Sequence, residues 1–148
     1  MLFVFMGPSC SGKSTAAEIV GKRTGAKIYS GKDYLRLAKA EGDAWRIFHE
    51  KLEEASKPDG EESLIFVCTE KELFDRIRVT ENIFTVRFTA TPEDIKRRFA
   101  ERMRGTLPKP LEVMLEKQMH LWEGIEAKLL VDSSSESPED AAERILTA

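Results

Sequence analysis

The sequence predicts an α/β fold in which helices cover both faces of a parallel sheet, giving a three-layer α/β/α sandwich. Short apolar runs alternate along the chain with longer amphipathic stretches, the pattern of strands joined by helical crossovers. A chain of 148 residues suits one domain with one sizeable core. No internal repeat or low-complexity segment interrupts the alternation. Residues 1–148 are therefore expected to form a single domain.

Five short apolar segments are expected to be the strands. The first of them runs straight into a glycine-rich segment, has no basic flank before it and is too short for a signal peptide. No apolar run approaches the roughly 20 residues that are needed to span a bilayer. The predicted strands are Leu2–Met6, Ala26–Tyr29, Leu64–Cys68, Ile83–Thr89 and Lys128–Val131.

The predicted helices are bounded by capping and turn residues. Thr91 can cap a helix that has proline in its first turn, acidic residues after it and an end near Arg104. Ser137 opens the last helix in the same way. Loops are expected at residues 56–62 and 105–110. The remaining helices are expected at residues 14–23, 71–78 and 111–124, and at 33–55 as one helix or two that break at Gly42-Asp43.

The glycine-rich segment matches the phosphate-binding pattern Gly-x-x-x-x-Gly-Lys-Ser through Gly7, Gly12, Lys13 and Ser14. It lies between a predicted strand and a predicted helix, so its backbone N–H groups and the helix N-terminus can face phosphate oxygens. Lys13 is expected to neutralise the β- and γ-phosphates of ATP, and the Ser14 hydroxyl to bind Mg²⁺. The expected nucleotide-binding residues are Gly7, Pro8, Ser9, Cys10, Ser11, Gly12, Lys13, Ser14 and Thr15.

Composition restricts the partners. The net charge of -3 lacks the basic surplus of a general nucleic-acid binder, and no membrane partner is expected. Cys10 and Cys68 lack the spacing of a disulfide framework, and free thiols fit a reducing cytoplasm. Cys10 is either a small loop residue that exposes its N–H or, next to a helix N-terminus, a redox switch. The protein is expected to be cytoplasmic, as a monomer or homodimer.

The residues downstream of the phosphate loop exclude a GTPase switch, and the small size of the chain disfavours a motor or AAA-type ATPase. A GTPase switch needs Asp-x-x-Gly and Asn-Lys-x-Asp, and neither pattern occurs in the chain. A motor or AAA-type ATPase needs a larger domain and an apolar strand that ends in an acidic residue. Only Glu70 comes after the third strand, and it lies slightly late.

The small size, the N-terminal phosphate loop and a late arginine-rich stretch resemble the nucleoside monophosphate kinase superfamily, which includes adenylate, shikimate and gluconate kinases. The resemblance covers most of the chain in the order of its elements. It implies a P-loop NTPase fold whose five-stranded parallel sheet has the order 2-3-1-4-5. It also implies an acceptor-binding helical region at about residues 33–60 and a short lid at about residues 102–112.

Asp33 and Arg36 are the acceptor-binding candidates. Asp33-Tyr34-Leu35-Arg36 resembles the Asp-x-Leu-Arg of adenylate kinases, in which the arginine holds the acceptor phosphate. In sugar and shikimate kinases an aspartate in this region meets the acceptor hydroxyl. A carboxylate can orient a hydroxyl and accept its proton. Asp33 also suits the cap of a helix, and the two roles are compatible.

The identity of the acceptor stays open between two classes. Leu64–Arg78 is similar to a gluconate kinase stretch, with Cys68-Thr69 and Phe74-Asp75-Arg76 in loose correspondence. The chain lacks the Gly-Gly-Gly of shikimate kinases and the Asp-Gly-Phe-Pro-Arg of adenylate kinases at this point. The expected acceptor is a nucleoside monophosphate or a gluconate- or shikimate-like hydroxy acid. Trp45 either lines the acceptor pocket or belongs to the core.

Arg98 and Arg102 are the candidates for stabilising the transferred phosphoryl group. They are four residues apart, on one helical face, and their spacing resembles the lid entry of adenylate kinases. Guanidinium groups can neutralise the charge that develops on the phosphoryl oxygens. The alternative is a solvated basic face paired with Glu93, Asp94 and Glu101. The residues from Val131 to Glu139 resemble the loop whose backbone touches adenine in these kinases.

These patterns together predict a phosphotransferase that uses ATP and Mg²⁺ to phosphorylate a small molecule, with Lys13, Asp33, Arg98 and Arg102 as catalytic residues. The alternative is a nucleotide-binding regulatory protein that has lost transfer activity.

Overall fold

The structure is a computed structural model that describes residues 1–148. Its centre is a parallel sheet of five strands in the order β2-β3-β1-β4-β5, which confirms the predicted order. The central strands β1 and β3 are fully buried, as expected for a parallel sheet covered on both faces. The strands are β1 (Leu2–Met6), β2 (Lys27–Ser30), β3 (Leu64–Cys68), β4 (Ile83–Thr89) and β5 (Leu129–Asp132).

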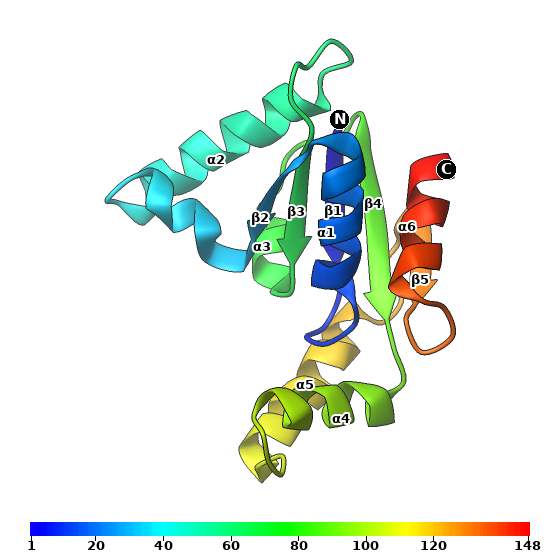
Figure 1. The fold of residues 1–148 in the computed structure, drawn as a ribbon. Coiled ribbons are helices and arrows are strands. Elements are labelled where there is room, and N and C mark those ends of the chain that lie inside the picture. Colours follow the sequence, from blue (N-terminus) through cyan, green and yellow to red (C-terminus); the bar gives the residue numbers. More distant parts are fainter.

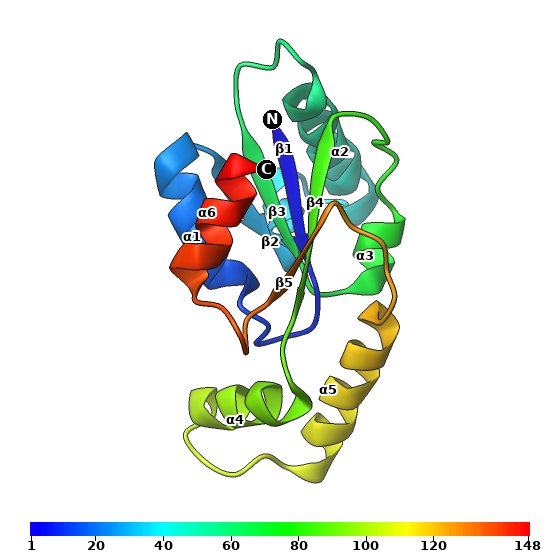
Figure 2. The same cartoon turned by 90° about the vertical axis from the view of Figure 1, so that its right-hand side faces the viewer.

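Helices cover both faces of the sheet (Figures 1 and 2). α1 and α6 pack together on one face, while α2 and α3 lie on the other. α4 and α5 lie beyond the carboxyl ends of the strands. None of the helices combines the length and the apolar composition of a membrane-spanning segment. The helices are α1 (Lys13–Thr24), the 3-10 helix η1 (Gly31–Leu37), α2 (Glu41–Ser56), α3 (Lys71–Asp75), α4 (Pro92–Arg102), α5 (Lys109–Trp122) and α6 (Pro138–Thr147).

The core has one cluster of buried side chains on each face of the sheet. Phe48 and Phe66 lie between α2 and the sheet, whereas Phe5 and Phe88 lie on the side of α1 and α6. A third, smaller cluster joins the phosphate loop to α4 and α5 through Cys10, Ala90, Ile95 and Leu115. The two outer helices are therefore attached to the phosphate loop by apolar packing.

Helix boundaries differ from the expectation in several places, and α3 ends at Asp75, three residues before the expected end. The break between η1 and α2 falls at residues 38–40, and Gly42 and Asp43 lie in the first turn of α2, where an acidic residue faces the positive helix end. α5 begins at Lys109, two residues before the expected start, because Pro110 fits the first turn of a helix. Both predicted caps are confirmed, since Thr91 and Ser137 accept hydrogen bonds from the N–H groups of Asp94 and Asp140.

Candidate active site

The phosphate loop joins β1 to α1, and two of its glycines are required by geometry. Gly7 has φ +148°, and a Cβ at this position would lie 2.3 Å from the carbonyl oxygen of Phe88. Gly12 caps α1 with φ +97°, a conformation that L side chains rarely adopt. The loop therefore curls tightly at the carboxyl end of β1, and α1 directs its N-terminus at the space that the loop encloses.

Lys13 is folded back against its own loop. Its ammonium group donates to the carbonyl oxygens of Gly7, at 2.8 Å, and Pro8, at 2.6 Å, and only 4% of the residue is exposed. Burial lowers the pKa of Lys13 to about 7, and the nearby guanidinium of Arg102 acts in the same direction. The lysine is thus held beside the loop amides with its charge poorly solvated, and an anion placed there would favour the charged form.

Two adjoining cavities lie over the loop. The smaller, called the phosphate cavity below, has a volume of about 90 Å³ and includes Ser9, Lys13, Ser14 and Thr69 in its lining. The larger, of about 510 Å³, extends toward Arg98, Glu101, Ser133 and Pro138. The lining residues that the two cavities share are Cys10, Gly12, Thr15 and Arg102. The site is therefore elongated, with loop amides and cations along its narrow part.

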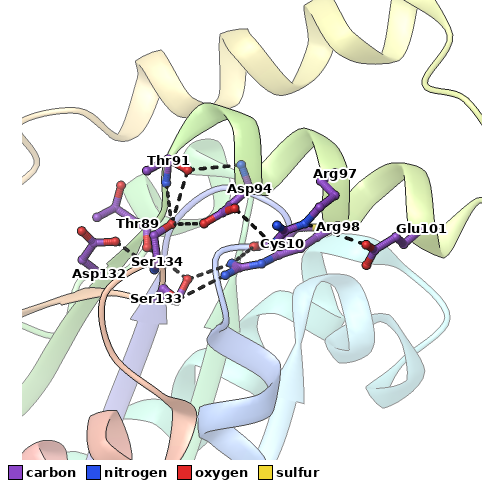
Figure 3. Close-up of polar contacts among 10 residues, drawn as sticks. All are labelled: Cys10, Thr89, Thr91, Asp94, Arg97, Arg98, Glu101, Asp132, Ser133 and Ser134. Carbon is purple, nitrogen blue, oxygen red and sulfur yellow. Dashed lines mark hydrogen bonds and ion pairs between the residues drawn. The ribbon is translucent and has the colours of Figure 1, made fainter.

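Arg98 and Arg102 leave the same face of α4 but have different partners. Arg98 donates to the carbonyl oxygen of Cys10 at 2.9 Å and to Ser133, through Oγ at 2.9 Å and the carbonyl oxygen at 3.1 Å (Figure 3). Arg102 makes no ion pair and lines both cavities. The solvated basic face exists as well, but it belongs to Arg97, which pairs with Asp94 and Glu101.

The loop after β5 is attached to the start of α4 (Figure 3). The Ser134 hydroxyl donates to Asp94 at 2.7 Å and accepts from the Thr91 N–H at 2.9 Å. Asp132 accepts from the Ser134 N–H at 3.0 Å and so closes a turn at the end of the strand. These bonds hold Ser133 beside Arg98, at the wide end of the site.

The residues at the loop suit a magnesium ion that is bound mainly through phosphate and water. Ser14 is exposed and its hydroxyl has no protein partner. No group of three or more His, Cys, Asp or Glu side chains is arranged to hold a metal ion. One hydroxyl beside bound phosphates matches the way in which Mg²⁺ keeps several waters and takes few protein ligands.

Asp33 and Arg36 lie in η1 and line neither of the cavities over the phosphate loop. Asp33 accepts from the Ser30 N–H at 3.0 Å in a capping box, and the exposed Arg36 lies 3.9 Å from its carboxylate. Both line a separate cavity with Lys27 and Leu37. The structure therefore brings Lys13, Ser14, Arg98 and Arg102 together and leaves Asp33 and Arg36 outside that group.

A fourth cavity, of about 230 Å³ and called the Glu70 cavity below, lies between η1, α2 and α3. Thr69 lines the phosphate cavity and the next residue, Glu70, lines this one, so the end of β3 separates the two spaces. The Glu70 carboxylate has no hydrogen-bond or ion-pair partner within the protein, and it is exposed. The remaining lining residues are Lys32, Tyr34, Leu35, Glu41, Glu72, Leu73 and Arg76.

Arg76 is the cation that sequence reasoning did not single out. Its guanidinium donates to Glu41 at 2.6 Å and lies 4.3 Å from the centre of the Trp45 ring, so Trp45 both joins the core and supports the cavity wall. The Tyr34 hydroxyl donates to Glu41 at 2.8 Å. The only sequence signal for Arg76 was its place in the Phe74-Asp75-Arg76 segment. Its partners come from α2 and η1, and no local sequence pattern connects those helices to Arg76.

Both cysteines are free thiols in buried positions. Burial raises the pKa of Cys10 despite the lowering effect of nearby Arg102, Lys13 and Arg98, and it raises the pKa of Cys68 to about 12. The uncharged thiol is therefore favoured at both positions. This protonation state favours the small-loop-residue interpretation of Cys10, because the reactive form of a redox cysteine is the thiolate.

Comparison with known proteins shows the fold. No family model and no curated protein matches the chain. A sugar kinase from Janibacter sp. is 23% identical with a TM-score of 0.64, covering 99% of this chain and 92% of its own. A gluconokinase from Sinorhizobium meliloti is 18% identical with a TM-score of 0.65, covering 98% and 89%. Shikimate kinase from Aquifex aeolicus is 17% identical with a TM-score of 0.56, covering 99% and 94%. The chain therefore has the fold of P-loop small-molecule kinases.

Proposed function

We propose that this protein is a kinase that uses ATP and Mg²⁺ to phosphorylate a small hydroxyl-bearing acid. The observation that carries the proposal is the junction at Thr69-Glu70, where a cavity over a phosphate loop adjoins a second cavity with a free carboxylate. This pair of neighbouring cavities, one on each side of the end of β3, suits a phosphate donor and an acceptor hydroxyl that must meet in line. The proposal is also supported by solved kinases of sugar, gluconate and shikimate with this fold.

In the proposed reaction the nucleotide base occupies the wide cavity beside Arg98 and Ser133, and the phosphates lie along the loop. Lys13 leaves its loop carbonyls, becomes fully charged and neutralises the phosphate oxygens. Mg²⁺, held through Ser14 and the phosphates, would neutralise further charge. Arg102 has no acidic partner to give up, so it is available for the phosphoryl group in transfer.

The acceptor is expected in the Glu70 cavity, with its hydroxyl toward Glu70. The cavity holds two cations, Lys32 and Arg76, beside three carboxylates, and Arg76 is already paired with Glu41. Lys32 can pair with a charged group of the acceptor, and the free carboxylate of Glu70 can orient the acceptor hydroxyl and accept its proton. Its 230 Å³ is below the usual range of ligand pockets, about 300–1,000 Å³, which favours a hydroxy acid over the larger nucleoside monophosphate. Asp33 then contributes indirectly: it caps η1, and residues of η1 line the cavity.

An acceptor screen tests the proposal. ADP release from Mg²⁺-ATP is measured with gluconate, shikimate, other hydroxy acids and nucleoside monophosphates, using Lys13→Ala as the control. We expect release that depends on a hydroxy acid and that is lost in the variant. Nucleotide binding with no acceptor-dependent release would instead support the alternative, a regulatory protein that has lost transfer activity.

We propose that the protein acts in the cytoplasm, with which its two free thiols agree. We propose that it is a monomer or a homodimer, without a nucleic-acid or membrane partner.

A further inference from the structure

Helix α5 contacts both walls of the narrow end of the phosphate cavity. The carboxamide oxygen of Gln118 accepts a hydrogen bond from the Ser9 N–H at 3.1 Å. The indole N–H of Trp122 donates to the carbonyl oxygen of Thr69 at 2.9 Å. The two side chains are four residues apart and so lie on one face of the helix. One helix face therefore fixes residues that belong to the loop after β1 and to the end of β3.

Ser9 and Thr69 belong to the part of the site that lies outside the wide cavity. Like Lys13 and Ser14 they line only the smaller cavity, whereas the two cavities share Cys10, Gly12, Thr15 and Arg102. If the base of a nucleotide lies in the wide cavity, its phosphates pass Gly12 and Thr15, which line both cavities. The third phosphate is then expected in the smaller cavity, which Ser9 and Thr69 also line.

The identity of the atoms at Ser9 is fixed by chemistry. A backbone N–H can only donate, so the carboxamide group must present its oxygen to it. The N–H groups of Cys10, Ser11 and Gly12 have no hydrogen-bond partner within the protein and remain available for phosphate. Ser9 is thus the one position between Pro8 and Lys13 whose amide is held by another part of the chain.

We propose that Gln118 is a positioning residue for the terminal phosphoryl group of the nucleotide. By holding the Ser9 N–H it sets the cavity wall against which a third phosphate lies, so that it serves a triphosphate and is dispensable for a diphosphate. The inference rests on the proposed function, since it takes ATP as the donor. Helix α5 carries no arginine, and through Gln118 it takes part in donor recognition by orienting the loop.

Loss of the Gln118 contact leaves the helix attached. Leu115 is fully buried in the cluster with Cys10, and Trp122 is 1% exposed and keeps its bond to Thr69. A Gln118→Met variant has a side chain of similar length and good helix propensity but no oxygen for Ser9. It is therefore expected to fold, which separates positioning from stability.

The test measures binding of Mg²⁺-ADP and of a non-hydrolysable ATP analogue by calorimetry, in wild type and Gln118→Met. We expect the Kd of the triphosphate analogue to rise roughly five- to tenfold, the effect of one lost hydrogen bond, and the Kd of ADP to stay within about twofold. Lys117→Met is the matched control, because Lys117 is exposed and makes no contact with the loop. It should change neither constant.

Hydrogen exchange of the Ser9 amide gives a second readout that is independent of nucleotide. Exchange should be faster in Gln118→Met and slow again in Gln118→Glu, whose carboxylate can accept the same bond. Equal weakening of both nucleotides, no weakening of either, or unchanged Ser9 exchange in Gln118→Met overturns the inference alone. A wild-type protein that binds neither nucleotide overturns the proposed function with it.

Discussion

The ammonium group of Lys13 lies 2.6 Å from the carbonyl oxygen of Pro8, within the loop to which both residues belong. The lysine is buried against its own loop, and its pKa there is about 7. A phosphate group bound beside Lys13 would supply negative charge and so favour the ammonium form of the lysine. Nucleotide binding and protonation of this one side chain are therefore linked.

The linkage predicts that the affinity for Mg²⁺-ATP falls as the pH rises above 7. In the free protein the ammonium form of Lys13 is lost through a pKa of about 7, whereas bound phosphate raises that pKa, so binding takes up as much as one proton. The Kd should rise by up to about tenfold per pH unit between pH 7 and 9. Calorimetry in buffers of different ionisation enthalpy measures the proton uptake. A Kd that is flat over this range contradicts the linkage.

Arg102→Gln is predicted to reduce turnover without affecting folding. The side chain has no ion-pair partner and faces both cavities over the loop, so its loss removes positive charge from the site without breaking an ion pair. We expect kcat to fall by roughly a hundredfold to a thousandfold, with an unchanged free energy of unfolding. Steady-state kinetics with the acceptor found by the screen check this. A change in KM for ATP alone would assign Arg102 to binding.

Arg98→Met is predicted to lower both stability and nucleotide affinity. Its three hydrogen bonds connect the phosphate loop to the loop after β5, and none of them can be made by methionine. The free energy of unfolding should fall by about 1–3 kcal/mol in a urea titration. Arg97→Met is the control on the same helix; its exposed ion pairs should contribute less than about 1 kcal/mol.

Gly7→Ala is predicted to disrupt the loop. The added Cβ meets the backbone oxygen of Phe88 at 2.3 Å, and neither atom belongs to a flexible side chain. We expect a loss of about 2 kcal/mol or more in the free energy of unfolding. Gly42→Ala is the matched control, since that position is helical and has open space around it, and stability should be unchanged or rise by up to about 1 kcal/mol. Equal effects at the two positions would contradict the geometry.

Glu70→Gln is predicted to lower turnover, whereas Asp33→Asn is predicted to affect mainly the stability of η1. Glu70 is the free carboxylate at the junction of the cavities, so its neutral variant should lower kcat by about a hundredfold or more. Asp33→Asn should lower the free energy of unfolding by less than about 1 kcal/mol, because asparagine retains an acceptor for Ser30. Kinetics and urea unfolding on both variants check this. A larger loss of kcat in Asp33→Asn would restore Asp33 as the acceptor residue.

The parts of the protein that the sequence predicted are those with local signals. The strands from Leu2 to Met6 and from Leu64 to Cys68 are continuous apolar runs, and the caps at Thr91 and Ser137 depend on residues within one turn. The phosphate loop is likewise contiguous. These elements were predicted because each needs only its own neighbours in the chain.

The rest of the site depends on contacts between distant residues. The spacing of Arg98 and Arg102 places both on one helix face but does not distinguish their partners, since Cys10 and Ser133 reach Arg98 only through the tertiary fold. Arg76 is matched by Glu41 across 35 residues, and Gln118 meets Ser9 across 109. Asp33 fits a cap and an acceptor residue equally well by sequence, and only the structure shows which N–H it accepts from.

The two tryptophans give the protein an intrinsic optical signal for each half of the site. Trp45 lies under the guanidinium of Arg76 beside the proposed acceptor cavity, and Trp122 donates its indole N–H to Thr69 at the phosphate cavity. They are the only tryptophans in the chain. A Trp45→Phe protein should therefore report nucleotide binding through its emission spectrum, and a Trp122→Phe protein should report the acceptor. The order in which donor and acceptor bind can then be followed without an attached dye.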